Sequence, residues 1–196
     1  MVDIDHLEFG LETFGDIVAN EDGSLQTAAQ SIRQIVREGQ LADELGLSVM
    51  GVGEHHRPDY SVSSPETVLA SIAAVTKNIK LATAVTVLSS DDPVRVYERF
   101  ATLDALSNGR AQVMLGRGSF TESFPLFGYD LTDYDDLFNE KLGLYDLLRN
   151  EKPVTWSGKF RASLKDQDVY PKTEHGKLET YIGIGGSPES IIRAVK

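Results

Sequence analysis

The sequence predicts an α/β protein whose strands form one parallel sheet. Strand-like apolar segments alternate with amphipathic helical segments, giving five βα units in chain order. Connections of helical length between successive strands favour right-handed crossovers and hence parallel pairing. Glycines and polar residues gather where the predicted strands end, which is where parallel α/β proteins place their sites. On these patterns alone, a doubly wound sheet and part of a (β/α)₈ barrel fit equally well.

Apolar alternation and apolar runs define the strands. In the first strand, Leu7, Phe9 and Leu11 share one face of an alternating segment. The third is an apolar run of residues. The five predicted strands cover residues 7–14, 47–53, 79–88, 111–115 and 180–184.

Capping residues mark the helices between the first four strands. Ser64 and Asp92 are good N-cap residues, and each is followed by proline at the first helical position. Gly46 and Gly109 stand where helix C-caps belong. The three predicted crossover helices cover residues 25–45, 65–77 and 93–106.

A long excursion, residues 120–178, separates the fourth strand from the fifth. It contains one amphipathic helix at 134–148 and a polar stretch with Trp156 and Pro171 that is typical of an irregular hairpin or lid. No repeat or low-complexity segment appears in the sequence. We therefore expect a single domain over residues 1–196 in which the excursion forms a lid.

The composition excludes several functional classes. The chain is 41% hydrophobic and 25% charged, as is ordinary for a globular protein. Its formal net charge is −11, and no basic run is interleaved with aromatics, so nucleic acid and anionic membranes are poor partners. The absence of cysteine excludes disulfides and thiolate chemistry. No apolar segment reaches the roughly 20 residues that span a bilayer, and the N-terminus is acidic, so we expect a cytoplasmic protein.

Two adjacent histidines, His55 and His56, follow Glu54 at the end of the second strand. Neighbouring strand residues point to opposite faces, and His6 and His175 show no ligand spacing, so we expect no metal site. One imidazole is expected to face the pocket as an acid, base or hydrogen-bond donor, oriented by Glu54 or by the other ring. Two satisfied structural histidines are the alternative.

Two loops are candidates for phosphate binding. Arg117 is followed by Gly118, so a guanidinium fork stands in a loop that can approach a ligand closely. After the fifth strand, Gly186 precedes Ser187 at the start of a helix, where free N–H groups and the hydroxyls of Ser187 and Ser190 favour an anion. Together the loops predict a phosphorylated cofactor. A solvated arginine and an ordinary capped junction are the alternatives.

The order of these motifs resembles that of the bacterial luciferase-like family of flavin-dependent monooxygenases. The motifs are GEHHR at 53–57, ATAVTVL at 82–88, DPVR at 92–95, ATLDALS at 101–107, GRGS at 116–119, FGYD at 127–130, WSG at 156–158 and IGIGGSPES at 182–190. Family members are (β/α)₈ TIM barrels. The resemblance therefore implies that this chain forms a partial barrel made of about the first five βα units.

The resemblance also implies a cofactor, reduced FMN, bound at the top of the barrel. In that arrangement the serines and the arginine hold the phosphate, and a non-proline cis peptide between Ala84 and Val85 lies under the flavin ring. The residues implied to bind the cofactor are Ala84, Val85, Arg117, Gly118, Ser119, Gly186, Ser187 and Ser190.

The implied reaction is addition of O₂ to reduced flavin, giving a C4a-peroxide that attacks an aldehyde or another small organic substrate. His55 matches the catalytic histidine of the family, and His56 its neighbour. Many relatives receive reduced flavin from a separate NAD(P)H-dependent flavin reductase. We also expect a homodimer formed through the second and third helices, where Ala70, Ala73 and Ala74 permit close approach.

Two other functions fit the sequence: an F420-dependent oxidoreductase on the same fold, or a non-catalytic flavin-binding protein. The chain has 196 residues, whereas a (β/α)₈ barrel typically needs about 250. Strands six to eight would close the barrel and complete one wall of the flavin pocket. We expect a truncated chain that need not be active by itself; a naturally shortened relative and a dimer of two partial barrels are the alternatives.

Overall fold

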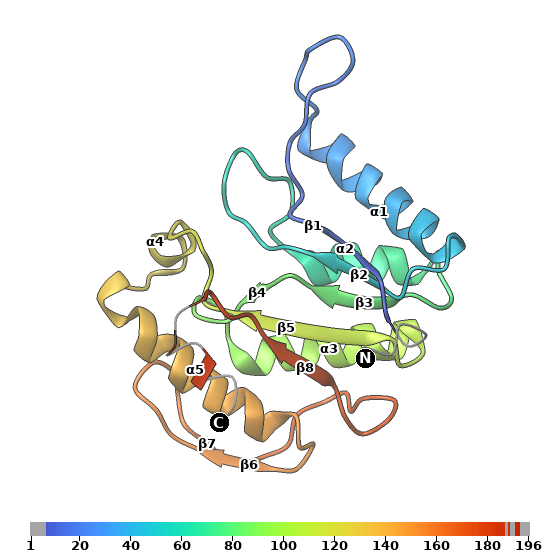
Figure 1. Ribbon diagram of the computed structural model, residues 1–196. Coiled ribbons are helices and arrows are strands. Elements are labelled where there is room, and N and C mark those ends of the chain that lie inside the picture. Colours follow the sequence, from blue (N-terminus) through green and yellow to red (C-terminus); the bar gives the residue numbers. More distant parts are fainter. Residues whose placement is uncertain (1–6, 187, 189–190, 193–196) are drawn as a thin grey trace.

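The computed structural model describes residues 7–186, 188 and 191–192 (Figure 1). Its main sheet is parallel throughout, with the order β1-β2-β3-β5-β4, and β8 also pairs with β5. The strands of this sheet are β1 (Gly10–Thr13), β2 (Val49–Val52), β3 (Lys80–Thr83), β4 (Thr86–Val87), β5 (Ala111–Gly116) and β8 (Glu179–Ile182). The predicted α/β class with a parallel sheet is confirmed.

One predicted strand, residues 79–88, is two strands in the structure. The break is a cis peptide bond between Ala84 and Val85. On one side of it β3 pairs with β2, and on the other side β4 pairs only with the last residues of β5. The cis bond lies at the position that the family resemblance implied, although the apolar run itself gave no sign of an interruption.

Four helices form a continuous outer layer against the sheet (Figure 1), with α1 beside α2, α2 beside α3, and α3 beside α5. Apolar side chains of α3 and β5 meet in the core, where Phe100, Tyr97 and Val113 are fully buried. The helices are α1 (Ala28–Glu44), α2 (Pro65–Ala73), α3 (Pro93–Ser107), α4 (Ser123–Phe127) and α5 (Tyr134–Leu148).

Helix caps explain most of the observed boundaries. The Asp92 carboxylate accepts hydrogen bonds from two N–H groups of the first turn of α3, and Gly109 adopts a φ of 77° after its last turn. Thr27 forms a capping box with Gln30, so α1 begins three residues later than the apolar pattern predicted. Ser64 precedes α2 as predicted, but its side chain makes no capping bond.

The excursion between β5 and β8 has the predicted helix, α5, at the predicted residues. The irregular hairpin is also present, as the antiparallel strands β6 (Val154–Trp156) and β7 (Leu164–Gln167). The sequence did not predict the five-residue helix α4 or the 3₁₀ turn Leu131–Asp133 before α5. The start of α4 lies beside the carboxyl ends of the strands, where Glu122 and Ser123 line a cavity together with residues that follow β1 and β2.

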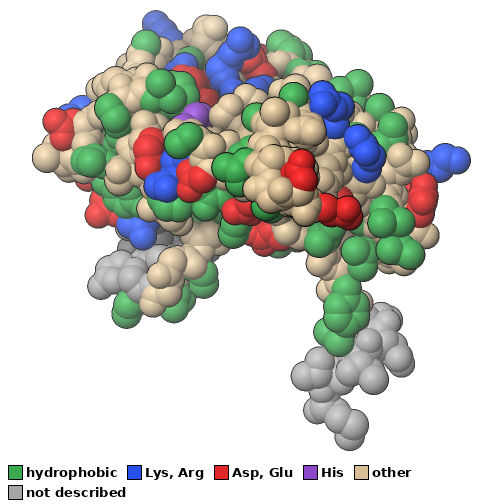
Figure 2. All heavy atoms as spheres, turned by 90° about the horizontal axis from the view of Figure 1, so that it is seen from above, with side chains coloured by type: hydrophobic (Ala, Val, Ile, Leu, Met, Phe, Trp, Pro, Cys, Tyr) green, Lys and Arg blue, Asp and Glu red, His purple; other side chains and the backbone are tan. Residues whose placement is uncertain are grey.

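Charges of both signs are dispersed over the face of the molecule that Figure 2 shows. Figure 2, which views the molecule from above Figure 1, shows Lys and Arg side chains interspersed with Asp and Glu side chains, and a histidine beside hydrophobic groups. Within the described part of the chain, no helix has both the length and the apolar content needed to cross a membrane.

Candidate active site

An aromatic cavity of about 360 Å³ opens at the carboxyl ends of the strands. Its walls come from β1, the loop after β2, the cis peptide segment and the loop that leads from β5 into α4. We call it the aromatic cavity because the rings of Phe14, Tyr60 and Phe120 line it together with two imidazoles. Its lining residues are Glu12, Phe14, Glu54, His55, His56, Tyr60, Ala84, Val85, Val87, Gly118, Ser119, Phe120, Glu122 and Ser123.

His55 is held in this cavity by aromatic rings. Its imidazole stacks on Tyr60 at a centroid distance of 4.0 Å and meets the edges of Phe14 at 5.6 Å and Phe120 at 5.5 Å. Burial lowers the pKa of His55, and this effect exceeds the opposing effects of the Phe14 backbone and nearby carboxylates. His55 is therefore mostly neutral at pH 7 and can both accept and donate a proton.

His56 has a different environment, because its Nε2 lies 2.9 Å from Oε1 of Glu54. The other Glu54 oxygen accepts a hydrogen bond from the backbone N–H of Val87, also at 2.9 Å. The side chains of Glu54 and His56 are 8% and 11% exposed. The sequence left open whether Glu54 or the other imidazole orients the histidine that faces the pocket. In the structure Glu54 bonds to His56, and His55 is packed among aromatic rings.

Arg57 fastens the segment that covers His55. Its guanidinium donates two hydrogen bonds to Asp59 and one, of 3.0 Å, to Glu122. It also lies 4.3 Å above the ring of Phe120. Sequence reasoning did not assign Tyr60 or Phe120 to the site, and no local pattern marks them, since they reach His55 from two different loops.

A second cavity, of about 330 Å³, adjoins the first and contains Arg117. Val85, Gly118 and Ser119 line both cavities, so the cis peptide segment is their common wall. We call this one the arginine cavity. Its lining residues are Val85, Gly116, Arg117, Gly118, Ser119, Tyr134, Gly183, Ile184 and Gly185.

Arg117 is paired rather than freely solvated. Its Nη1 donates a 2.8 Å hydrogen bond to Asp135, and its guanidinium lies 5.2 Å from the ring centroid of Tyr134. The Tyr134 hydroxyl in turn donates to the carbonyl of Gly118, at 2.8 Å. These contacts orient the guanidinium beside the arginine cavity, where an anion would compete with Asp135.

The loop after β8 supplies the other side of the arginine cavity. Gly185 lines it, and Gly186 follows with a φ of 82°, a conformation that favours glycine. The predicted phosphate ligands Ser187 and Ser190 lie outside the described residues. The structure thus brings together the predicted Ala84, Val85, Arg117, Gly118 and Ser119, and it places His55 and His56 in the neighbouring cavity.

The residues present fit a flat aromatic cofactor that carries a phosphate. Backbone and small side chains form the wall between the cavities. There is no room for a side chain at Gly116, since a Cβ there would lie 2.4 Å from Cγ2 of Val85. A flat ring can lie on this wall beside the aromatic rings, while a phosphate can reach Arg117. Across the described ranges, no group of three or more His, Asp or Glu side chains is arranged to hold a metal ion.

One characterised relative is N-acetyl-S-alkylcysteine monooxygenase of Bacillus subtilis (strain 168). It is 32% identical over 178 residues, which is 89% of this chain and 51% of that protein. The chain therefore spans about half the length of this relative.

Solved structures share the fold. Monooxygenase RslO1 from Streptomyces bottropensis superposes with a TM-score of 0.81 at 26% identity, over 94% of this chain and 55% of that one. The oxygenating constituent of 3,6-diketocamphane monooxygenase from Pseudomonas putida, in complex with FMN, gives 0.78 at 22% identity, over 92% and 53%. An F420-dependent secondary alcohol dehydrogenase gives 0.74 at 21% identity, over 95% and 55%.

These neighbours show that the parallel sheet is part of a luciferase-like TIM barrel. The family model described as luciferase-like monooxygenase matches residues 13–196, nearly the whole chain. His55 and His56, the cis peptide and Arg117 also lie at the positions that the motifs indicated. The chain therefore belongs to the luciferase-like monooxygenase family.

Proposed function

We propose that this protein is a flavin-dependent monooxygenase that uses reduced FMN and O₂ to oxidise an aldehyde-like or other small organic substrate. The observation that carries the proposal is the shared wall of the two cavities, formed by Val85, Gly118 and Ser119. It puts an aromatic-lined space directly beside an arginine. A relative named as a monooxygenase and a structural neighbour in complex with FMN support the same assignment.

The residues of the arginine cavity would hold the phosphate. Arg117 would exchange its bond to Asp135 for bonds to the phosphate, and Ser119, with Ser187 and Ser190 after β8, would add hydroxyl donors. When bound, reduced FMN supplies the electrons for oxygen activation. Ala84 and Val85 would support the ring, because their small side chains leave the backbone accessible from the aromatic cavity.

The residues of the aromatic cavity would exclude water and handle protons. Phe14, Tyr60 and Phe120 surround His55, which keeps the imidazole in one orientation and in a poorly hydrated space. Because burial lowers its pKa, His55 is available as a neutral group that can accept a proton from the substrate or donate one at an oxygen atom.

Replacing His55 with alanine is expected to spare flavin binding and to lower substrate-coupled oxygen consumption by about 100-fold or more, the usual range for a lost general acid or base. The measurement is oxygen uptake with reduced FMN and a panel of aldehydes, beside a flavin titration. His175→Ala is the matched control, because His175 is exposed beside Gly109, at the opposite end of β5. Unchanged oxygen uptake in the His55 variant would remove the proposed role.

A second candidate is an F420-dependent oxidoreductase, which is favoured by the neighbour solved with an F420-acetone adduct. Titration with F420 and FMN side by side distinguishes the two, since each oxidised cofactor has its own absorbance. If FMN binds tightly but no substrate raises oxygen uptake, the protein is instead a flavin-binding protein without oxygenase activity. In the oxygenase case, we expect a separate NAD(P)H-dependent reductase to supply the reduced flavin.

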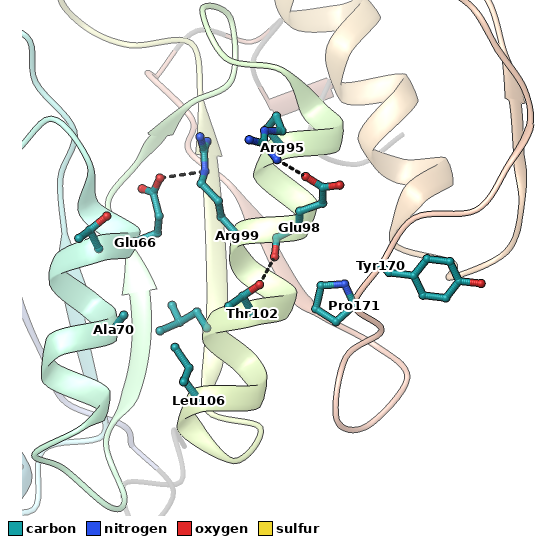
Figure 3. Close-up of a pocket in the computed structure, with 11 residues that line it drawn as sticks. Glu66, Ala70, Arg95, Glu98, Arg99, Thr102, Leu106, Tyr170 and Pro171 are labelled. Atoms are coloured by element: carbon teal, nitrogen blue, oxygen red, sulfur yellow. Dashed lines mark hydrogen bonds and ion pairs between the residues drawn. The ribbon is translucent and has the colours of Figure 1, made fainter.

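We further propose that α2 and α3 form a homodimer interface. Between them lies a surface groove of about 600 Å³, seen in Figure 3, where Ala70 and Leu106 face the open space. Of the three alanines expected to allow close approach, Ala73 is only 5% exposed and belongs to the core, so it cannot contact a partner. A monomeric mass in solution, measured by sedimentation or light scattering, would contradict this interface.

A further inference from the structure

A third cavity lies next to His56 and differs in character from the other two. It has a volume of about 260 Å³, and most of the groups that line it are polar or charged. We call it the polar cavity. Its lining residues are Glu54, His56, Ser63, Ser64, Glu66, Ser90, Asp91, Arg99 and Phe127.

Glu54 and His56 line both the aromatic cavity and the polar cavity. The two side chains therefore stand between the proposed reaction site and a polar space outside it. Phe127 of α4 packs its ring edge-on against His56, with centroids 5.2 Å apart, and of the two cavities it lines only the polar one. A group that is reached from both sides can take up a proton on one side and release one on the other.

Charged residues of α2 and α3 continue the polar surface away from His56. Arg99 lies between two carboxylates: its Nε is 2.8 Å from Glu66, and its Nη2 contacts Asp91. Figure 3 shows Glu66 and Arg99 reaching toward each other from neighbouring helices. Burial raises the pKa of both Glu66 and Asp91, with Arg99 opposing it, so these carboxyl groups bind protons more readily than exposed ones.

We propose that the Glu54–His56 pair is the junction through which protons pass between the aromatic cavity and the polar cavity, with Glu54 as the positioning residue for His56. The proposal rests on the proposed function, since an oxygenase site needs proton exchange with solvent while remaining shielded from it. The polar cavity is large enough for several water molecules, each of which takes about 30 Å³ in the liquid.

The hydrogen bond to Glu54 determines which nitrogen of the His56 ring carries the proton. A carboxylate can only accept, so Nε2 of His56 carries the proton that Oε1 of Glu54 accepts, and Nδ1 is the acceptor nitrogen of the ring. A proton that arrives at Nδ1 makes the ring an imidazolium. Release of the Nε2 proton, by way of Glu54, to water in the polar cavity leaves the neutral ring in its Nδ1–H form, and water-mediated tautomerisation returns it to the Nε2–H form. One proton enters and one leaves, and no group is oxidised or reduced.

The tautomer of His56 tests the role of Glu54 directly. In Glu54→Gln, the amide oxygen must accept from the Val87 N–H, so the amide NH₂ faces Nε2 of His56. Long-range ¹H–¹⁵N NMR of the ligand-free chain should show the Nε2–H form in the wild type and the Nδ1–H form in this variant. Glu21→Gln, on an exposed loop, should behave as the wild type does. A wild-type ring protonated at Nδ1 would overturn the proposal.

A larger side chain in the polar cavity tests whether protons reach His56 through that cavity. Ser64 lines this cavity, is exposed and makes no capping bond, so Ser64→Leu should fill the space without loosening α2. We expect exchange of the His56 ring N–H with water to slow by at least about 10-fold. The same change at exposed Ser71 of α2, which lines no part of this cavity, should have no effect. Equal exchange rates in both variants would show that protons reach His56 by another path.

Both measurements use the ligand-free chain, so they are independent of flavin binding. If the His56 tautomer and the exchange rates of its ring N–H are as expected but FMN does not bind, the proposed function is wrong and the proposed role of the Glu54–His56 pair still holds. If FMN binds and supports oxidation while the Ser64 variant exchanges normally, the junction fails and the proposed function remains.

Discussion

Replacing Gly116 with alanine is expected to displace Val85 from the wall between the two cavities, to destabilise the protein and to remove FMN binding. The added Cβ would lie 2.4 Å from Cγ2 of Val85 and within 3.3 Å of every other atom beyond Cα in that side chain. Val85 cannot yield easily, because Gly183 also lies close to it: a Cβ at Gly183 would be 3.0 Å from Cγ1 of Val85. Overpacking of this kind costs about 1–3 kcal/mol of stability.

The same exchange at Gly143 is the matched control. Gly143 lies on the exposed side of α5, and a Cβ there meets no heavy atom within 4 Å. Alanine should stabilise the helix by up to about 1 kcal/mol, because glycine is the poorer helix former. Thermal unfolding monitored by circular dichroism, together with a flavin titration, gives both results. A Gly116 variant that melts and binds FMN as the wild type does would show that the wall is not tightly packed.

Arg110→Ala is expected to cause the largest loss of stability, about 4 kcal/mol, because several hydrogen bonds from a charged group would be lost and buried carbonyls left unpaired. The guanidinium of Arg110 joins the end of α2, the start of β3 and the end of α3. Its acceptors are the carbonyl oxygens of Ala73, Thr76, Ile79 and Ser107 and the hydroxyl of Thr76.

Urea unfolding of the Arg110 variant measures this loss, with Arg33→Ala on the exposed face of α1 as the control. The control should change the free energy of unfolding by less than about 0.5 kcal/mol. Asp43 supports the same loop from the other side, since its carboxylate accepts bonds from the N–H groups of Lys77, Asn78 and Ile79. Equal midpoints for the two arginine variants would contradict the structural role of Arg110.

Local sequence patterns predicted the alternation of strands and helices well because each pattern reports on its own segment. The Asp92 cap and the position of α5 depend only on neighbouring residues, and both are confirmed. The division of residues 79–88 into β3 and β4 depends on one peptide bond, which no apolar pattern reveals; only the resemblance pointed to it. The helix α4 has five residues, too few to show a helical period.

The candidate site was predictable at the strand ends and less so in its contacts. Arg117 follows β5 directly and His55 lies three residues after the end of β2, so topology alone brings them to one edge of the sheet. The partner of Arg117 is Asp135, 18 residues further along, and only the folded excursion brings the two together. The same applies to Phe120 and Tyr60 around His55, and to the polar cavity between α2, α3 and α4.

The most direct test of the proposed flavin site is an anaerobic titration of the chain with reduced FMN, repeated with Arg117→Ala and Asp135→Asn. We expect saturable binding by the wild type and an affinity about 10- to 100-fold lower for the Arg117 variant, the usual worth of hydrogen bonds to a charged group. Asp135→Asn should bind at least as tightly as the wild type, because Asp135 competes with the phosphate for Arg117. Equal affinities for wild type and Arg117→Ala, or no saturable binding by the folded wild-type chain, would contradict the flavin site.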